Sequence, residues 1–432
     1  MATLSTLSVN EKGHLTIGGL DTVELVKKHG SPLYVMDENV IRQSCADFRD
    51  AIEKYYDGNG LCIYASKAFC CKEMCRIIDD EKCGLDVVSG GEIYTARAAG
   101  FPMERVFFHG NNKSREELEL ALDSGVGRII VDNISELELL NSLCVSMNKR
   151  ASIYMRIKPG IDAHTHSFIR TGQIDSKFGF ALETGEALDA VKKAVSYGNI
   201  DLVGFHCHIG SQIFELEPFT AAADVMIGFI ALAEKECGVK ICELDLGGGF
   251  GIRYTDEDKP RAYTEFIDSA SAAVKAACKA HGVAMPKIMI EPGRSIVGPA
   301  GITLYTVGAV KHIPNIRTYV SIDGGMGDNP RYILYSSKYD LIVANKADLP
   351  KTETITLAGK CCESGDLIQE NALTQPVEVG DIMAVTATGA YNYSMASNYN
   401  RIPRLPVVMV KDGVDRTVIR RETYEDLIRL DV

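Results

Sequence analysis

The chain of 432 residues contains no tryptophan, and no stretch approaches the roughly 18 consecutive apolar residues that a membrane-spanning helix needs. Basic residues are in the minority, with 46 Lys and Arg against 58 Asp and Glu, so the formal net charge is −12. Because a protein that binds phosphate backbones needs a basic face, we expect no nucleic-acid partner and no membrane association. The opening MATLSTLSVNEKG has neither the apolar core of a signal peptide nor the arginines of a transit peptide, which predicts a cytoplasmic protein.

Thirteen cysteines might suggest a disulfide scaffold, but their number is odd and their spacing is irregular. Several, such as Cys62 and Cys207, lie inside apolar runs. Reduced and mostly buried thiols are the better interpretation for a long chain. Cys71 and Cys75 have the spacing of neighbours on one helix face, where a metal could bind, but no second ligand pair accompanies them.

Short apolar runs alternate with amphipathic stretches from about residue 35 onwards, a pattern typical of a parallel sheet. The expected strands are 61–66, 84–88, 105–108, 128–131, 152–157, 201–207, 241–246 and 287–290. Eight such units between residues 61 and 290 favour a closed (β/α)8 TIM barrel, and an open doubly wound sheet is the alternative. The fold class is therefore α/β.

The pattern changes after Pro299, where short β-rich runs such as AGITLYTVGAV and DIMAVTAT are separated by turn residues. This texture predicts an antiparallel β domain at the C-terminal end. We expect three parts: an N-terminal segment, 1–35, that joins the C-terminal sheet; the barrel, 36–298; and the β domain, 299–432.

Active sites of such barrels lie at the carboxyl ends of the strands, so the residues there are the first candidates for chemistry. Seven of the eight expected strands end near an ionisable residue. The candidates are Lys67, Asp86, His109, Asn111, Asp132, Arg156, His206, His208, Gly247–Gly249, Glu291 and Arg294.

Lys67 follows the first strand, where an inward-facing amine would lose its solvation and could attack a carbonyl as a neutral base. A surface lysine is the alternative. Gly247, Gly248 and Gly249 follow the seventh strand, and Gly293 and Arg294 follow the eighth. These are the two positions where this fold binds phosphate, although a glycine run alone could be a plain tight turn.

Glu291 could be a general base, a partner of a protonated ring nitrogen, or half of a structural ion pair. His206 and His208 point to one side of their strand, which suits metal ligation as well as stacking on a cofactor ring. The pair His164 and His166 adds to the metal hypothesis. Against a metal, no carboxylate set nearby completes a ligand group, and we expect the deeper His206 to be a satisfied core histidine.

Three stretches of the C-terminal part are unusually polar: 323–331, 361–366 and 389–400. Each could be a solvated loop. Together, however, they offer an arginine and tyrosines for a carboxylate, a glutamate for an ammonium group, and a cysteine as proton donor, and this set suits an amino acid. The residues are Arg331, Tyr335, Cys362, Glu363 and Tyr391.

Seven motifs in this order resemble the diaminopimelate decarboxylases, pyridoxal-phosphate (PLP) enzymes with the barrel fold of alanine racemase. They are YASKAF, HCHIGSQ, LDLGGGFG, EPGRSIVG, DGGMGDNPR, CCESGD and GAYNYSMAS. The stretch HTHSFIRTGQIDSKFG also looks like this family rather than its ornithine- or arginine-decarboxylating relatives. The similarity runs from about Pro32 to Pro403.

The resemblance implies a role for each candidate. Lys67 forms a Schiff base with the cofactor, His208 stacks on its ring, and Glu291 pairs with its pyridine nitrogen. The phosphate lies against Ser211, Gly247, Gly248, Gly249, Gly293, Arg294 and Tyr391. Arg294, Arg331 and Tyr335 bind the substrate carboxylate farthest from the reacting carbon, with Tyr391 beside them. Cys362 and Glu363 enter the site of a partner subunit, which implies a homodimer with shared active sites.

The implied reaction removes CO2 from meso-2,6-diaminoheptanedioate (diaminopimelate) and gives L-lysine, the last step of lysine biosynthesis. Either Cys362 or Lys67 supplies the proton. A related decarboxylase of a basic amino acid or polyamine precursor is the nearest alternative, and a metal-dependent barrel hydrolase is a more distant one. A racemase of this fold would pair the ring nitrogen with an arginine, against Glu291, and PLP-carrier barrel proteins lack a large β domain.

Overall fold

The computed structural model describes residues 7–161 and 175–432, which form two compact units. One unit comprises 44–251 and 260–293, and we call it the barrel unit. The other comprises 1–43, 252–259 and 294–432, and we call it the β unit. The segment 252–259 therefore belongs to the β unit, although the residues before and after it belong to the barrel unit. The expected domain boundaries at 35/36 and 298/299 stay a prediction.

Eight parallel strands close into a barrel, because β8 and β9 pair with each other and β13 pairs with β5. The strands are β5 (Gly60–Ala65), β6 (Gly84–Val87), β7 (Val106–Phe108), β8 (Arg128–Val131), β9 (Ala151–Lys158), β11 (Ile200–His206), β12 (Glu243–Asp245) and β13 (Lys287–Ile290). Each overlaps one of the eight runs expected from the sequence, so the closed barrel is confirmed and the open sheet is excluded. A short strand, β10 (Phe180–Ala181), extends the pairing of β9.

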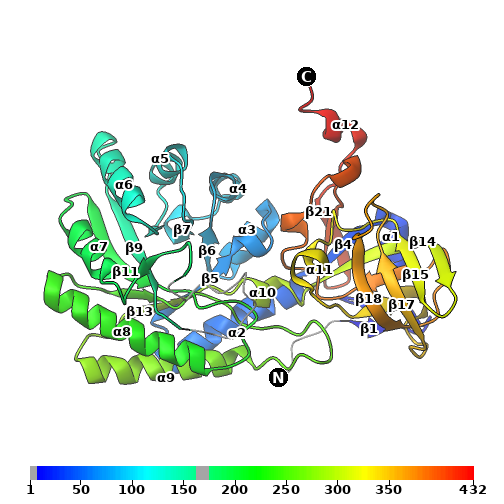
Figure 1. Ribbon diagram of the computed structural model, residues 1–432, viewed down its shortest axis with the longest axis horizontal. Helices are drawn as coiled ribbons and strands as arrows, with labels where there is room; N and C mark the ends of the chain where they lie inside the picture. Colours follow the sequence, from blue (N-terminus) through cyan, green and yellow to red (C-terminus); the bar gives the residue numbers. More distant parts are fainter. Residues whose placement is uncertain (1–6, 162–174) are drawn as a thin grey trace. The chain divides into compact units, whose positions relative to one another are not determined.

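Helices alternate with these strands and surround them (Figure 1). They are α2 (Glu38–Tyr56), which begins in the β unit, α3 (Lys72–Asp80), α4 (Gly90–Ala99), α5 (Arg115–Ser124), α6 (Ile134–Ser146), α7 (Glu186–Val195), α8 (Glu217–Cys237) and α9 (Tyr263–His281), with single turns at η1 (Ser66–Ala68) and η2 (Met103–Arg105). The sequence sets their ends locally: α5 begins at a capping box of Ser114 and Glu117 and ends at left-handed Gly125.

The interior of the barrel is filled by side chains, as in other barrels of this size. Ile63, Phe107, Ile130, Tyr154 and Met289 form one buried cluster from five different strands. Because this packing closes the interior, the polar chemistry of the barrel is confined to the strand ends.

The β unit has a nine-stranded sheet that is mostly antiparallel, which confirms the expected β domain. Its strands are β4 (Leu33–Asp37), β14 (Gly301–Ile313), β15 (Arg317–Ile322), β16 (Leu341–Val343), β17 (Glu353–Ala358), β18 (Leu367–Thr374), β19 (Ile382–Val385), β20 (Val407–Lys411) and β21 (Val414–Ile419). Two pairings, β15 with β17 and β20 with β4, are parallel. Strand β4 lies between β14 and β20, so the N-terminal region supplies a central strand.

Smaller elements complete this unit. They are β1 (Ser8–Val9), β2 (Leu15–Ile17), β3 (Leu20–Asp21), α1 (Thr22–His29), α10 (Arg294–Val297), α11 (Arg331–Tyr335), α12 (Tyr424–Ile428), η4 (Ala344–Lys346), η5 (Tyr393–Met395) and η6 (Tyr399–Arg401). Leu15 and Ile17 pack with Leu33, Ile302 and Val408 in one buried cluster, which ties the first strands to the sheet.

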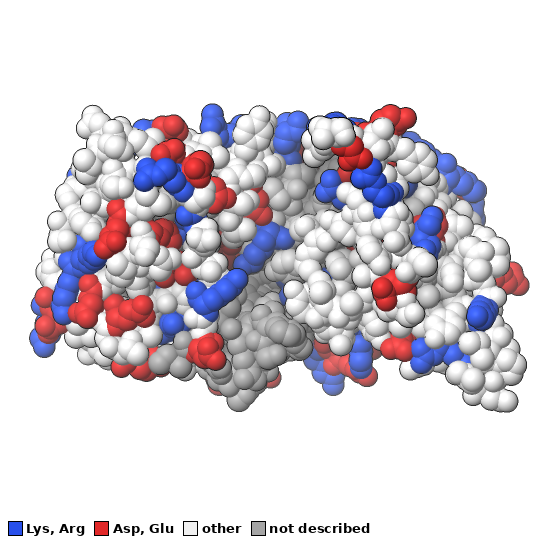
Figure 2. All heavy atoms as spheres, turned by 45° about the horizontal axis from the view of Figure 1, so that its top comes forward, with Lys and Arg blue, Asp and Glu red and all other residues white. Residues whose placement is uncertain are grey.

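On the face drawn in Figure 2, acidic and basic side chains are interspersed over both units. No helix within 7–161 and 175–432 has the length and apolar character that a membrane span requires. The structure describes all thirteen cysteines, and every one is a free thiol.

Glu38 at the start of α2 is a carboxylate with three cationic partners and a side chain only 2 % exposed. It accepts hydrogen bonds from Arg42 Nε at 2.6 Å, from Lys411 Nζ at 3.1 Å, and from Arg416. Burial alone would raise the pKa of Glu38, but these three cations lower it to about 2. The carboxylate therefore joins α2 to the β20–β21 hairpin.

We expect Glu38→Gln to lower the free energy of unfolding at neutral pH by about 3 kcal/mol, the scale of breaking a buried charge pair. Because folding lowers this pKa from 4.5 to about 2, the stabilisation is complete above pH 4.5 and is lost as the pH falls through 2. Denaturant unfolding at several pH values measures the difference, which should shrink in acid. Glu24→Gln, at a carboxylate that is 54 % exposed, is the control and should change stability by less than about 1 kcal/mol.

Candidate active site

Five buried ionisable side chains gather at the carboxyl ends of the barrel strands, and we call them the carboxylate cluster. They are Asp86, His109, His206, Asp245 and Glu291. Asp86 is the penultimate residue of β6, and the other four end or directly follow β7, β11, β12 and β13. Closure of the barrel therefore brings together residues that are up to 205 positions apart in the sequence.

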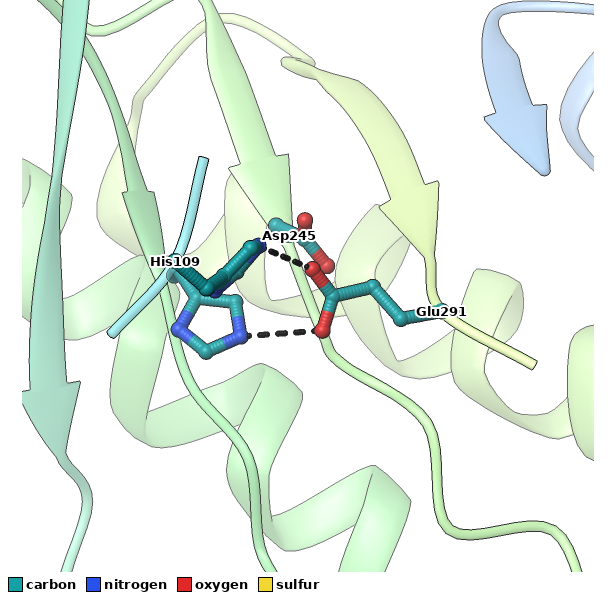
Figure 3. A group of neighbouring side chains, drawn as sticks. His109, Asp245 and Glu291 are labelled. Carbon is teal, nitrogen blue, oxygen red and sulfur yellow. Dashed lines mark hydrogen bonds and ion pairs between the residues drawn. The ribbon is translucent and has the colours of Figure 1, made fainter. Parts of the chain in front are cut away.

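Glu291 lies at the centre of this cluster (Figure 3). One oxygen, Oε2, lies 3.2 Å from Nε2 of His206, and the other, Oε1, lies 2.7 Å from Nε2 of His109. The contact with His109 is close, but neither of its two atoms has a directed hydrogen-bond partner among the described residues. Burial alone would raise the pKa of Glu291, yet His109 and His206 hold it well below its usual range. Glu291 is therefore an ionised carboxylate in a buried place.

The pKa of Asp245, which lies beside Glu291, is shifted in the opposite direction. Burial and then the negative charge of Glu291 raise the pKa of Asp245 well above its usual range. One oxygen of Asp245 accepts the N–H of Gly247 at 2.8 Å. Two neighbouring carboxylates whose pKa values are pushed apart are a common feature of active sites, because one stays ionised while the other keeps its proton.

The hydrogen bonding and the surroundings of His206 differ from what the sequence predicts. His206 is not a satisfied core histidine, because its Nδ1 has no hydrogen-bond partner among the described residues. Burial lowers the pKa of His206 to about 4, so the ring is neutral at physiological pH. The argument that no carboxylates accompany it was also wrong, since ligand atoms of His109, His206, Asp245 and Glu291 lie within 4.8 Å of one another. His164 and His166 lie outside the described residues.

Loops after three strands and the end of β5 pack tightly against each other, and glycines make this possible. A Cβ on Gly248 would lie 2.0 Å from the carbonyl oxygen of Glu291. Gly247 has φ +70°, and a Cβ there would lie 2.5 Å from the carbonyl oxygen of Cys207. A Cβ on Gly249 would lie 2.5 Å from the carbonyl oxygen of Gly210, and one on Gly293 would lie 2.9 Å from the Cβ of Ala65. The glycine run is therefore more than a plain turn, because the neighbouring backbones leave no room for side chains.

His208, Ser211 and Lys67 lie around these loops. His208 Nδ1 accepts the N–H of Gly248 at 3.3 Å, which orients the half-buried imidazole. Burial and then the charge of Lys67 lower the pKa of His208. Ser211 is half-buried in the loop after β11. Lys67 lies in η1 directly after β5 and is exposed, so the expected loss of solvation is not present in this structure.

The β unit contains a second group of polar residues, which we call the arginine cluster: the buried Tyr254, Arg294, Arg331 and Tyr339, and the half-buried Tyr391. The guanidiniums of Arg294 and Arg331 lie over the ring of Tyr391, at 4.8 and 5.8 Å from its centre. Tyr391 has φ +68°, a strained value for a residue other than glycine and one that clusters at functional sites. The half-buried ring of Tyr335 lies 5.7 Å from Arg331.

The three polar stretches of the β unit are tied together. The buried carboxylate of Asp366 accepts the N–H groups of Met326 and Cys361, at 2.6 and 2.7 Å. The third stretch is joined through Asn400, which accepts the N–H of Cys362 at 2.8 Å. Cys362 and Glu363 are both exposed, and neither belongs to the carboxylate cluster or the arginine cluster.

Sequence reasoning missed three residues of these clusters: Asp245, Tyr254 and Tyr339. Asp245 ends the seventh strand, so the strand-end rule applies to it as much as to the glycine run that follows it. Tyr254 and Tyr339 carried no comparable signal, because a tyrosine in a loop is common and only the fold brings these two to the arginines.

The barrel part of the chain, residues 38–298, matches a family described as pyridoxal-dependent decarboxylase, pyridoxal binding domain. Over 99 % of its length the chain is 50 % identical to the diaminopimelate decarboxylase of Halalkalibacterium halodurans, of which 97 % is covered. It is 48 % identical to that of Bacillus subtilis over 98 % of the chain and 96 % of the relative.

Solved structures give the same result. The diaminopimelate decarboxylase of M. jannaschii in complex with L-lysine is 34 % identical, with a TM-score of 0.92 over 100 % of this chain and 99 % of the other. That of Helicobacter pylori, also with L-lysine, is 32 % identical, with a TM-score of 0.86 over 95 % and 99 %. The lysine/ornithine decarboxylase of Vibrio vulnificus, at 23 % identity, shares the fold.

The carboxylate cluster suits a pyridoxal cofactor. An ionised carboxylate is the group that stabilises a protonated pyridine nitrogen, and Oε1 of Glu291 accepts no directed hydrogen bond from the described residues. Glycine loops at the ends of β12 and β13 are of the kind that receive a phosphate in this fold.

We expect Gly248→Ala to destabilise the barrel unit by about 1–3 kcal/mol, because a Cβ 2.0 Å from a carbonyl oxygen forces the backbone to move. Denaturant unfolding measures this. Gly198→Ala is the matched control, since nothing lies within 4 Å of its added Cβ and its φ is not positive. Equal stability of the two variants would contradict the tight packing of the loops.

Proposed function

The chain belongs to the diaminopimelate decarboxylases, and from this premise we infer its reaction and propose the roles of its residues. It is a PLP-dependent carboxy-lyase that removes one carboxyl group of meso-2,6-diaminoheptanedioate and releases L-lysine and CO2, the last step of lysine biosynthesis. The observation that best supports this substrate is the arginine cluster. Arg331 is buried and pairs with no carboxylate among the described residues, and a decarboxylase of lysine or ornithine would not need such a cation.

We propose that the barrel unit holds the cofactor. Lys67 binds its aldehyde carbon through the ε-amine, and Glu291 pairs with the protonated ring nitrogen. His208, already oriented by Gly248, stacks on the ring. The bound cofactor supplies an electron sink for the pair of electrons that CO2 leaves behind. The charge of Glu291 keeps the ring nitrogen protonated, which is the condition for that role.

The phosphate of the cofactor is proposed to lie against backbone N–H groups and one cation. Glycine loops expose N–H groups that side chains would otherwise shield. The residues of this site are Ser211, Gly247, Gly248, Gly249, Gly293, Arg294 and Tyr391.

The substrate's distal carboxylate is proposed to bind Arg294 and Arg331, assisted by Tyr335 and Tyr391. Two guanidiniums can bind one carboxylate through several parallel hydrogen bonds, which fixes the orientation of the substrate as well as its charge. The reacting end is thereby placed by contacts at the far end of the molecule.

Cys362 and Glu363 are proposed to complete the site of a second copy in a homodimer. This is supported by the exposure of both side chains. Glu363 would bind the substrate's ammonium group, and Cys362 or Lys67 would donate the proton that replaces CO2. We also propose a cytoplasmic location, which the thirteen free thiols support, because free thiols persist in reducing compartments.

Borohydride treatment of the holoenzyme should attach the cofactor irreversibly to the peptide YASKAF, through Lys67, because a Schiff base is reduced to a stable amine. Peptide mass spectrometry locates the label. Lys67→Ala should lose the absorbance of the bound cofactor and nearly all activity. Lys72→Ala, an exposed lysine five residues further on, is the control and should keep both. Label on another lysine would overturn the assignment.

Arg331→Ala should lower kcat/KM for diaminopimelate. The loss of transition-state stabilisation should be about 3–5 kcal/mol, the scale on which a buried charge loses its partner. Residual turnover of lysine or ornithine should fall far less, because the single carboxylate of each is the one that leaves as CO2 and none then remains for the distal site. CO2 release from each substrate measures both effects, and Arg420→Ala, at a side chain that is 70 % exposed, is the control. Equal losses on all substrates would mean that Arg331 shapes the site generally. Turnover of ornithine by the wild type, without turnover of diaminopimelate, would overturn the substrate assignment.

A further inference from the structure

The two guanidiniums of the arginine cluster share one oxygen atom. The hydroxyl of Tyr254 accepts from Arg294 Nη1 at 2.5 Å and from Arg331 Nη1 at 2.7 Å. Tyr254 is 8 % exposed and reaches this position from the segment 252–259, where Asp258 accepts its backbone N–H at 3.0 Å. Two like charges are therefore held together around a single acceptor.

The surroundings of Tyr254 are well defined. Arg294 and Arg331 also lie over its ring, at 5.7 and 5.1 Å from the centre. The ring of Tyr339 meets it edge-on at 5.6 Å, and the Tyr339 hydroxyl lies 3.4 Å from Arg331 Nη1. The groups that face the hydroxyl are thus two cations and one further phenol, and no Asp or Glu of the described residues lies within ion-pair distance of Arg331.

We propose that Tyr254 is a positioning residue for the substrate's distal carboxylate. Its hydroxyl holds Arg294 and Arg331 side by side as one binding site, and when it ionises it competes with the carboxylate for the same two cations. This inference rests on the proposed function, because it assumes that the arginine cluster binds the end of diaminopimelate that does not react.

The geometry supports the first part of the proposal. Long arginine side chains lose conformational freedom when they converge on a ligand, and a group that holds them beforehand reduces that loss. A neutral phenol accepts two hydrogen bonds and still has its own proton to donate, so it can hold both guanidiniums and offer an O–H to an incoming carboxylate.

The charges support the second part. Burial alone would raise the pKa of Tyr254, but Arg294 and Arg331 outweigh it and leave the pKa below that of an ordinary phenol. As the pH rises, Tyr254 therefore becomes a phenolate at a lower pH than an ordinary phenol does. A phenolate cancels one of the two positive charges, and affinity for a carboxylate should then fall.

Tyr254→Phe is the direct test, because it removes the hydroxyl and keeps the ring in its packing. L-Lysine, which retains the distal carboxylate, and 1,5-diaminopentane, which has none, serve as paired probes of the holoenzyme. At neutral pH the variant should bind L-lysine about tenfold more weakly and 1,5-diaminopentane equally well, with KM for diaminopimelate raised more than kcat is lowered. Tyr332→Phe is the matched control. Tyr332 lies on the same helix as Arg331, and its hydroxyl donates to Glu370.

The pH dependence separates positioning from mere packing. The ratio of the L-lysine inhibition constants, variant over wild type, should fall toward one as the pH is raised from neutral into the alkaline range, since ionisation removes the advantage of the wild type. Titration of the ligand itself cancels in this ratio. Should the variant fail to fold, the wild type still gives an answer: L-lysine, but not 1,5-diaminopentane, should reduce its tyrosinate absorbance at alkaline pH.

Several results would overturn the proposal. Three are unchanged L-lysine binding in the variant, equal weakening of both probes, and a ratio that does not vary with pH. The fourth is a variant that loses the cofactor but binds L-lysine normally, which would assign the hydroxyl to the phosphate. A wild type that binds L-lysine no better than 1,5-diaminopentane would instead contradict the carboxylate site of the proposed function itself.

Discussion

The ionised carboxylate of Glu291 is the constraint on which the proposed chemistry depends. A buried carboxylate would ordinarily take up a proton, and here two imidazoles prevent this while the neighbouring Asp245 keeps its own proton. The negative charge is thus fixed at one position before any cofactor arrives. A protonated pyridine nitrogen is the partner that this charge suits, and the electron sink of the reaction requires that nitrogen to stay protonated.

The closed barrel makes such a cluster possible. Parallel strands deliver their carboxyl ends to one rim, so residues from five strands meet there although each is isolated in the sequence. The β unit supplies the opposite charge, in two buried guanidiniums around Tyr254. The barrel unit thus carries a buried anion for the cofactor, and the β unit carries buried cations for a carboxylate. This division fits a reaction in which the cofactor and the distal end of the substrate must each be held by charge.

Most of the fold and part of the site could be predicted from the sequence. Eight apolar runs gave the barrel, and the strand-end rule led to Lys67, Glu291 and the glycine loops. Asp245 could not be distinguished from the sequence, because it directly precedes a glycine run that is itself a candidate phosphate site. Tyr254 could not be predicted, because only tertiary contacts bring it to its two arginines. The expected desolvation of Lys67 depends on what covers the amine, and a sequence pattern does not contain that information.

Glu291→Gln tests the central claim most directly, because it removes the charge and keeps the shape. The variant should retain the cofactor, since the glycine loops and Lys67 are unchanged, and its kcat for diaminopimelate should fall by roughly 10²-fold or more, as for other losses of a key electrostatic partner. Cofactor content from absorbance and CO2 release from the same sample give both values. Wild-type kcat in the variant would contradict the account and would make Glu291 a structural residue.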